Sequence, residues 1–173
     1  MHNVHERVVA APADRVGALV DGLGSPGDRL WPSPTWPPMR LDRPLAVGAR
    51  GGHAAIRYEV TAHEPGRRAE FTFAPGIGAR GTHTFTVTPL DADRALLRHE
   101  MVARFEGPML LGWPLAVRWL HDALLEDLLD RADDAVGTPP ARRARPSAWV
   151  RLLRRLWLPV PRSGGRNRRA AEV

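Results

Sequence analysis

Alternating apolar and polar residues dominate the middle of the chain. Residues 56–62, 69–73, 82–88 and 95–105 each follow this alternation, which predicts β-strands with one buried and one exposed face. Only short segments rich in Pro, Gly and Asp separate the strands of each pair, so we expect two consecutive antiparallel hairpins. A valine-rich segment, residues 4–10, predicts a further strand near the N-terminus.

The turn of the first hairpin sets its expected register. Pro65 and Gly66 follow Glu64. Proline presets the second position of a type II turn, and glycine supplies the positive φ that the third position needs. This turn brings the apolar residues of both strands onto one face. The expected pairs are Ala62 with Ala69, Val60 with Phe71, and Tyr58 with Phe73.

The second hairpin carries two histidines among its inward-facing residues. These residues are His83, Phe85, Val87, Leu97, His99, Met101, Ala103 and Phe105. If Val87 pairs with Ala95, His83 lies directly across from His99, with Cβ atoms roughly 4.5–5.5 Å apart. A register shifted by two residues places His83 opposite Met101 instead.

Helical spacing predicts a long helix that ends near residue 135 and begins at Met109 or Pro114. Its apolar stripe contains Leu120, Leu124, Leu128 and Ala132, widened by Trp119, Ala123 and Leu125. The opposite face carries Asp122, Glu126, Asp130 and Asp133. Gly137 ends the helix, because glycine readily adopts the left-handed C-terminal conformation. A shorter helix follows Pro12, and the five prolines of residues 25–38 predict irregular structure.

Three segments carry a family resemblance. Residues 8–16 join a strand through a proline to a helix, residues 45–50 form a glycine-containing approach to the sheet, and residues 58–68 form the Pro-Gly hairpin. With the closing long helix, they resemble the START-like, or SRPBCC, superfamily over about residues 4–137. That superfamily includes the pollen-allergen-like, polyketide cyclase/dehydrase and lipid-transport families.

The resemblance implies an α+β helix-grip fold. In this fold a curved antiparallel sheet of six to seven strands wraps around a long C-terminal helix, with short helices after the first strand and an apolar cavity between sheet and helix. Members bind lipids, sterols, polyketides or hormones, and some catalyse cyclisation or dehydration. The superfamily has no universal catalytic motif, so the resemblance assigns no catalytic residue to this chain.

His83, His99 and Tyr58 are the candidate catalytic residues. Two neighbouring imidazoles can share a proton, hold a polar ligand group or bind a metal, and they can equally be structural histidines hydrogen-bonded to the fold or to water. Tyr58, the only tyrosine, can orient a ligand carbonyl or serve as a core residue. The candidate ligand-binding residues are Trp31, Trp36, His53, Tyr58, Phe71, Phe73, His83, Phe85, His99, Met101, His121 and Leu124.

Several of these candidates have alternative roles. Trp31 and Trp36 form an aromatic lid at the cavity mouth or anchor a loop with few other apolar residues. His53 faces the cavity mouth or the surface. His121 borders the apolar stripe of the long helix, where it reaches the ligand or serves in helix packing.

The charge of the chain is divided unevenly. All 25 basic residues are arginine. Residues 1–137 hold 15 Arg against 18 Asp and Glu, a net charge of −3, whereas residues 138–173 hold 10 Arg and one Glu, a net charge of +9. We therefore expect a START-like domain at residues 1–137, followed by three segments. These are a Pro/Arg-rich linker at 138–147, a basic amphipathic helix at 148–158 and a disordered tail at 159–173.

The basic helix has more than one reading. Tryptophan and arginine on a short amphipathic helix suit an anionic membrane surface, and the same helix can dock on the acidic body of its own domain. Clustered arginines also suit nucleic acid, but no known reader motif supports a nucleic-acid partner and we expect none.

The sequence also argues against several classes of site. There are no cysteines, and His83 and His99 have no third ligand at metal-site spacing, so we expect no metal. Residues 22–27 fit G-x-G-x-x-G, but a helix precedes them and proline-rich chain follows, so we expect no nucleotide cofactor. The chain has neither the apolar run of a signal peptide nor about 18 consecutive apolar residues, which favours a cytoplasmic protein, peripheral at the membrane if the basic helix binds there.

These observations favour the binding of a small hydrophobic ligand, such as a lipid or polyketide, in an internal cavity between sheet and long helix. The alternative is an enzyme of polyketide cyclase or dehydratase type that uses His83, His99 and Tyr58 for acid–base chemistry. The pattern leaves the oligomeric state open.

Overall fold

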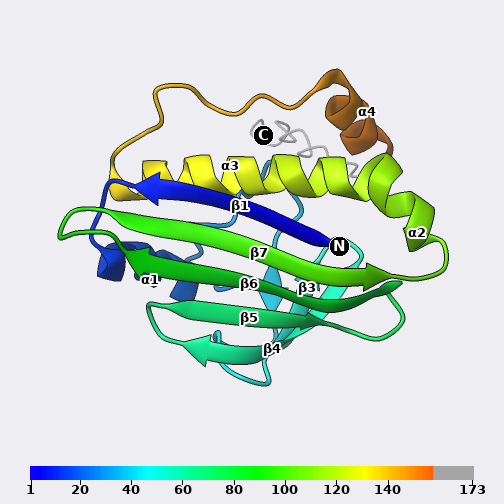
Figure 1. The fold of residues 1–173 in the computed structure, drawn as a ribbon, viewed down its shortest axis with the longest axis horizontal. Helices are drawn as coiled ribbons and strands as arrows, with labels where there is room; N and C mark the ends of the chain where they lie inside the picture. The colour runs from blue at the N-terminus through cyan, green and yellow to red at the C-terminus, as the bar shows by residue number, and fades with distance from the viewer. Residues whose placement is uncertain (158–173) are drawn as a thin grey trace, which may run out of the picture.

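The computed structural model describes residues 1–157 and contains one antiparallel sheet of seven strands. The strand order is β1-β7-β6-β5-β4-β3-β2. The strands are β1 (His2–Val9), β2 (Arg40–Leu41), β3 (Arg50–His53), β4 (Ile56–Glu64), β5 (Arg68–Phe73), β6 (Ala79–Pro89) and β7 (Ala95–Phe105). Figure 1 shows α3 running alongside β1 and across the sheet.

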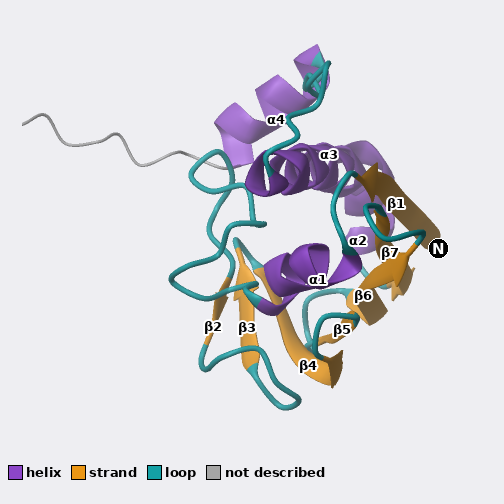
Figure 2. Cartoon of the chain, turned by 90° about the vertical axis from the view of Figure 1, so that its left-hand side faces the viewer, coloured by secondary structure: helices purple, strands orange, loops and turns teal. Residues whose placement is uncertain are grey.

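The helices are α1 (Ala13–Asp21), α2 (Met109–Gly112), η1 (Trp113–Val117), α3 (Arg118–Val136) and α4 (Ala148–Trp157). Segments α2, η1 and α3 follow one another without a break and form one long helix, in which η1 is a π-helical turn. Figure 2 shows the sheet curving around α1, with α3 across its open side. This arrangement is the predicted α+β helix-grip fold, with one short helix rather than several after β1.

The first predicted hairpin has the expected turn and part of the expected register. Arg67 N–H donates to the Glu64 carbonyl at 2.9 Å, and Gly66 has φ of 73°. The pairs of Tyr58 with Phe73 and of Val60 with Phe71 are confirmed. The third pair is wrong: a β-bulge between Val60 and Ala62 places Ala62 opposite Glu70, because the extra residue shifts the strand by one position.

The second hairpin does not have the register that pairs Val87 with Ala95 and His83 with His99; it has the register shifted by two residues. Val87 lies opposite Leu97, and His83 lies opposite Met101. The loop closes on Pro89 and Ala95, with Leu90 N–H donating to the Arg94 carbonyl at 3.0 Å. His83 and His99 are therefore diagonal neighbours on the inward face, a position from which long and aromatic side chains still meet.

Both the apolar face and the acidic face of helix α3 are covered by other parts of the protein. Leu124, Leu125, Leu128 and Ala132 are buried in the main core. The acidic side is covered as well, because β1 lies over it: Asp130 is 4% exposed and Asp133 7%. Trp119 does not widen the buried stripe, since it is 47% exposed. The helix ends as predicted at Gly137, which has φ of 85°.

Helix α4 docks on the domain. Val150 and Leu153 are buried, and Val150 belongs to the main core. The Arg154 guanidinium lies 4.6 Å from the ring centroid of Trp36. The preceding segment is held by Arg143, which forms two hydrogen bonds to the Asp134 carboxylate. The predicted disordered tail at 159–173 lies outside the described residues. Within residues 1–157, every helix is too short or too polar to cross a bilayer.

Candidate functional site

A row of rings lies between the sheet and α3, buried at Tyr58, His83 and His99 and half-buried at its two ends. We call His53, Tyr58, His83, His99 and His121 the imidazole row. Successive ring centroids in this order are 5.9, 4.9, 5.6 and 5.3 Å apart. The row begins beside Trp31, whose ring centroid lies 4.7 Å from that of His53. Strands β3, β4, β6 and β7 and helix α3 each supply one member.

Aromatic side chains enclose the centre of the row. Phe71 stacks on His83, with ring centroids 4.9 Å apart and an interplanar angle of 11°. Phe73 lies 5.3 Å from His83, and Phe85 meets His99 edge-on at 4.7 Å. These rings come from inward positions of β5 and β6, where strand periodicity points alternate residues to one face. The two central imidazoles are thus held in an apolar environment.

The apolar environment keeps the central histidines uncharged. Burial lowers the pKa of His53 and of His83 to about 3, and it lowers the pKa of His99 well below the ordinary value. Burial raises the pKa of Tyr58, so its phenol stays protonated. A neutral imidazole offers one N–H donor and one acceptor nitrogen. The row can therefore hydrogen-bond a ligand carbonyl or hydroxyl without carrying charge.

Three ring nitrogens of the row are buried without a hydrogen-bond partner in the described protein. They are Nε2 of His83, Nδ1 of His99 and Nδ1 of His121. His83 is 8% exposed and His99 3%. A buried polar atom without a partner costs about 1–3 kcal/mol, so a molecule that pairs with these nitrogens gains stabilisation from the site.

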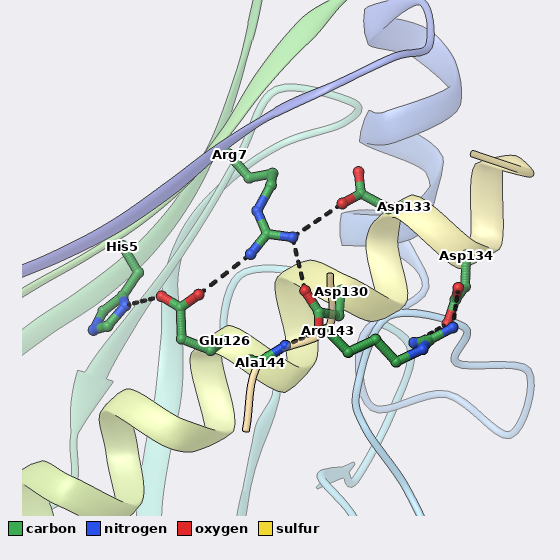
Figure 3. A network of polar contacts seen from close by, with 8 residues as sticks. All are labelled: His5, Arg7, Glu126, Asp130, Asp133, Asp134, Arg143 and Ala144. Atoms are coloured by element: carbon green, nitrogen blue, oxygen red, sulfur yellow. Dashed lines mark hydrogen bonds and ion pairs between the residues drawn. The ribbon is translucent and has the colours of Figure 1, made fainter. Parts of the chain in front are cut away.

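A second polar cluster joins β1 to α3 at the end of the row. We call His5 and Arg7, with Asp122, Glu126, Asp130 and Asp133, the ion-pair ladder. His5 binds Asp122 at 3.1 Å and Glu126 at 3.0 Å. Figure 3 shows Arg7 reaching three carboxylates, with distances of 3.2 Å to Glu126, 2.8 Å to Asp130 and 3.0 Å to Asp133.

The spacing of the ladder follows from the two elements that form it. Alternate residues of a strand lie about 6.6–6.8 Å apart, and residues four apart on a helix rise about 6 Å. His5 and Arg7 on β1 therefore match Asp122, Glu126 and Asp130 on α3. The ring of His121 lies 6.0 Å from that of His5, which connects the ladder to the row.

Charge is concentrated in the ladder. Burial lowers the pKa of His5, but the hydrogen bonds and charges of Asp122 and Glu126 outweigh it and raise the pKa to about 9. The hydrogen bond from His5 in turn lowers the pKa of Glu126. Burial raises the pKa of Asp133 despite its bond to Arg7.

The structure brings most of the predicted ligand-binding residues together, with three exceptions. Trp36 lies apart from the row, and its indole N–H donates to Asp127 at 2.7 Å, which anchors the proline-rich segment on α3. Leu124 is a buried residue of the main core. Met101 lies opposite His83 and packs with Ala103 and Trp113 in a separate cluster.

Sequence reasoning missed His5 and Arg7. The available signal was a strand with basic residues on one parity and a helix with carboxylates at intervals of three or four residues. Neither pattern indicates that the strand pairs with the helix, because more than 110 residues of chain separate the two elements.

Two open hollows lie near these clusters. The larger, of about 730 Å³, is beside β3, β4 and β5, and its lining includes Tyr58 and Phe73 together with Arg50, Glu59 and Thr72. Neither His83 nor His99 lines this hollow. Glu59 and Thr72 alternate along their strands with the inward-facing pair Tyr58 and Phe73, so they face away from the row. The smaller, of about 230 Å³, lies between α1 and the end of α3. The enclosed cavity that the helix-grip resemblance implies stays a prediction.

Solved structures share this fold at low sequence identity. Norcoclaurine synthase from Thalictrum flavum, in complex with dopamine and hydroxybenzaldehyde, matches with a TM-score of 0.61 and 13% identity over 82% of this chain and 89% of its own. CalU16 from Micromonospora echinospora matches with 0.55 and 15% over 92% and 87%. A Thermobifida fusca protein matches with 0.57 and 18% over 82% and 99%. No protein-family model and no curated protein sequence matches the chain.

Proposed function

Because the chain has the helix-grip fold of START-like, or SRPBCC, proteins, we propose that it binds a small, largely apolar molecule that carries a carbonyl or hydroxyl group. Phe71, Phe73 and Phe85 provide the apolar contacts. The polar group bonds to the imidazoles of His83 and His99. The Thalictrum enzyme, solved with two small aromatic molecules, supports this class of ligand.

The unpartnered nitrogens of His83 and His99 are the observation that carries the proposal. Ligand sites of this kind are mostly apolar, with a few polar groups that fix orientation. The central part of the row has this composition: two neutral imidazoles, with ring centroids 5.6 Å apart, among phenylalanines.

Acid–base catalysis is the weaker proposal for the same residues. A general base works best when its pKa lies near the working pH. With a pKa of about 3, His83 is a poor acceptor for the proton of an enolisable ketone. Tyr58 stays protonated, which suits hydrogen bonding to a carbonyl rather than proton removal. The charge states therefore favour a binding protein over a cyclase or dehydratase.

A matched pair of probes tests the binding proposal. 2-Acetylnaphthalene and 2-isopropylnaphthalene have nearly the same shape, but only the first has a carbonyl. We expect the full-length protein to bind the ketone about fivefold more tightly, in a calorimetric titration, since one hydrogen bond contributes about 1 kcal/mol. The preference should disappear in His83→Phe or His99→Phe and persist in the surface control His2→Phe.

Two outcomes contradict this proposal. One is the absence of saturable binding of either probe, with no small molecule co-purifying in native mass spectrometry. The other is equal binding of both probes by all four proteins. Exchange of the ketone α-protons in D₂O, followed by NMR, separates the alternatives: exchange that depends on His83 would favour the enzyme.

We also propose that the end of the domain near α4 contacts an anionic membrane. Seven large apolar side chains are exposed on α2, η1, the start of α3 and α4. They are Leu110, Leu111, Leu115, Trp119, Trp149, Leu152 and Leu156. The Trp149 indole N–H donates to the Leu115 carbonyl at 3.0 Å, which joins the two helical segments. Exposed Arg118, Arg151 and Arg155 accompany them, a composition that suits anionic lipid.

Vesicle co-sedimentation tests the membrane proposal. We expect binding to vesicles containing phosphatidylserine and little binding to phosphatidylcholine alone. The double variants Leu110→Ser/Leu115→Ser and Leu152→Ser/Leu156→Ser should each reduce binding. Val8→Ser/Val47→Ser, at exposed apolar positions elsewhere, serves as the control. Equal sedimentation of all variants would overturn the proposal.

A further inference from the structure

His5, His121 and Asp122 gather three metal-ligating atoms where β1 crosses the start of α3. Nε2 of His5 lies 3.1 Å from Oδ1 of Asp122, and Nδ1 of His121 lies 3.5 Å from the same oxygen. One ligand atom from each residue lies within 4.8 Å of the other two. We propose that these side chains bind one divalent transition-metal cation of the Zn²⁺ or Co²⁺ type.

The spacing of the three atoms suits such a cation. Zinc binds histidine nitrogen at 2.0–2.1 Å and carboxylate oxygen at 2.0–2.2 Å. Around a tetrahedral ion, neighbouring ligand atoms are therefore about 3.3–3.5 Å apart. The two distances to Asp122 differ from this spacing by small amounts, so modest side-chain movement forms the site. Two imidazoles and one carboxylate leave the fourth position for water or for a ligand oxygen.

The surrounding contacts orient the proposed ligands. The Glu126 carboxylate accepts a hydrogen bond from Nδ1 of His5 at 3.0 Å. A metal-bound histidine commonly makes this contact through its second nitrogen, which directs the first nitrogen to the ion. The Asn3 side-chain N–H donates to Asp122 at 3.0 Å and fixes the carboxylate. The cluster therefore has outer contacts on two of its three ligands.

The environment of His121 also favours a cation. Its Nδ1 is buried without a well-formed hydrogen bond in the described protein, and its nearest acidic oxygen is Oδ1 of Asp122 at 3.5 Å. A cation bridging the two residues would give this nitrogen a partner. The electrostatic environment also favours a cation, because the four carboxylates of Asp122, Glu126, Asp130 and Asp133 outnumber the neighbouring cations. These cations are His5, Arg7 and Arg118, whose Nε lies 3.5 Å from the second oxygen of Asp122. Protonated His5 alone already bridges two of these carboxylates, so a salt bridge without metal is the competing outcome.

Metal titration of the tag-free full-length chain tests the proposal. Co²⁺ serves as a spectroscopic probe through its visible absorption, and Zn²⁺ competes with it. We expect one Co²⁺ per chain and displacement by Zn²⁺. Loss of an outer contact commonly weakens metal binding 10–100-fold, so we expect at least about that loss for Asp122→Asn and His121→Phe, and a loss of about tenfold for Glu126→Gln.

His63 provides the matched control. Its Nε2 lies 3.0 Å from Asp21, and its side chain is as buried as that of His5, but it belongs to no group of three ligands among the described residues. His63→Gln should leave Co²⁺ affinity unchanged.

An NMR measurement on the wild-type chain avoids variants that fail to fold. Paramagnetic Co²⁺ should broaden the imidazole signals of His5 and His121 before those of His2 and His63. Two results would overturn the proposed metal site. One is the absence of saturable Co²⁺ and Zn²⁺ binding, and the other is binding that broadens the signals of all four histidines equally. In either case His5 forms salt bridges with Asp122 and Glu126 and binds no metal. Neither result bears on the naphthalene probes, so this proposal and the ligand proposal fail separately.

Discussion

Three ring-to-ring contacts connect His83 with His5, through His99 and His121, yet the two histidines carry different charges at neutral pH. Burial among aromatic rings lowers the pKa of His83 to about 3. Burial acts on His5 as well, but two carboxylate partners outweigh it and raise the pKa to about 9. The balance between burial and charged partners decides the charge of each histidine. His121 illustrates the balance, because burial lowers its pKa although Asp122 lies beside it.

This difference separates two kinds of site within one interior. The imidazole row is uncharged and suits an apolar ligand with a polar group. The ion-pair ladder is charged and suits a cation. The row lies mainly on the sheet, whereas the ladder depends on the contact of β1 with α3. Variants on each side of this boundary should therefore differ in stability, in pH dependence and in ligand affinity.

The largest effect is expected at Arg7. Arg7→Met leaves Asp130 and Asp133, whose side chains are only 6% and 9% exposed, without their cation. Removing one partner of a buried ion pair commonly costs 3–5 kcal/mol, and we expect a loss of about this size in the free energy of unfolding measured with urea. Arg43→Met, which breaks an exposed pair with Asp42, is the control. Similar losses in the two variants would contradict the importance of the ladder.

A smaller loss is expected at His5. His5→Phe keeps the ring but removes two hydrogen bonds to carboxylates. Hydrogen bonds to charged groups contribute about 1.5–3 kcal/mol each. Because the two carboxylates retain partial solvent contact, we expect a total loss of about 2–3 kcal/mol by urea unfolding. A loss under about 0.5 kcal/mol, the usual effect of a surface substitution, would mean that the pair is no stronger than a surface contact.

The pH dependence of stability should distinguish the two regions. The pKa of His5 in the folded state, about 9, lies above its ordinary value of 6.5. Its contribution is therefore complete below pH 6.5 and is lost as the pH rises toward 9. The pKa values of His53 and His83, about 3, lie below 6.5. Their contribution is present above pH 6.5 and is lost as the pH falls toward 3.

Urea unfolding at intervals from pH 4 to 9 measures both effects. Each group changes stability by at most about 1.4 kcal/mol per pH unit. We expect His5→Gln to remove the decline between pH 6.5 and 9 and to leave the acid decline due to His53 and His83. The part of the acid decline that comes from Glu126 should shrink in this variant, because the hydrogen bond from His5 is the main cause of the lowered pKa of Glu126. An alkaline decline of unchanged slope in His5→Gln would assign it to another group.

The smallest effect on stability is expected at His83. His83→Phe replaces an unpartnered Nε2 by a carbon in a ring stack with Phe71. Removal of an unsatisfied polar atom offsets small packing changes, so we expect a change within about 1 kcal/mol. The same variant should lose the preference for the naphthalene ketone. A loss of stability as large as that of His5→Phe would remove the contrast between the two regions.

The register of the second hairpin illustrates a limit of sequence reasoning. Alternation predicts which residues face inward, and His83, Phe85, His99 and Met101 are all buried. A shift of two residues preserves that face, because the side-chain period of a strand is two. The pattern is therefore equally consistent with His83 opposite His99 and His83 opposite Met101. Closure of the loop between Pro89 and Ala95 decides between them.

The ladder illustrates a second limit. The sequence predicts the acidic face of α3 correctly, but an acidic helix face ordinarily points to solvent. Nothing local indicates that β1 covers it with His5 and Arg7. Similarly, the amphipathic pattern predicts α4, but the residues it buries are Val150 and Leu153, while Trp149, Leu152 and Leu156 stay exposed.

The sequence by itself determined the first strand, the four strands of the two hairpins, the long helix, the Pro65-Gly66 turn and the helix end at Gly137, because these depend on neighbouring residues and on periods of 2 and 3.6. It did not predict the short strand β3. The tertiary structure alone decided the register of β6 with β7, the bulge in β4, the contact of β1 with α3 and the charge of each histidine. Those features depend on contacts between distant parts of the chain, where a single partner can outweigh any local preference.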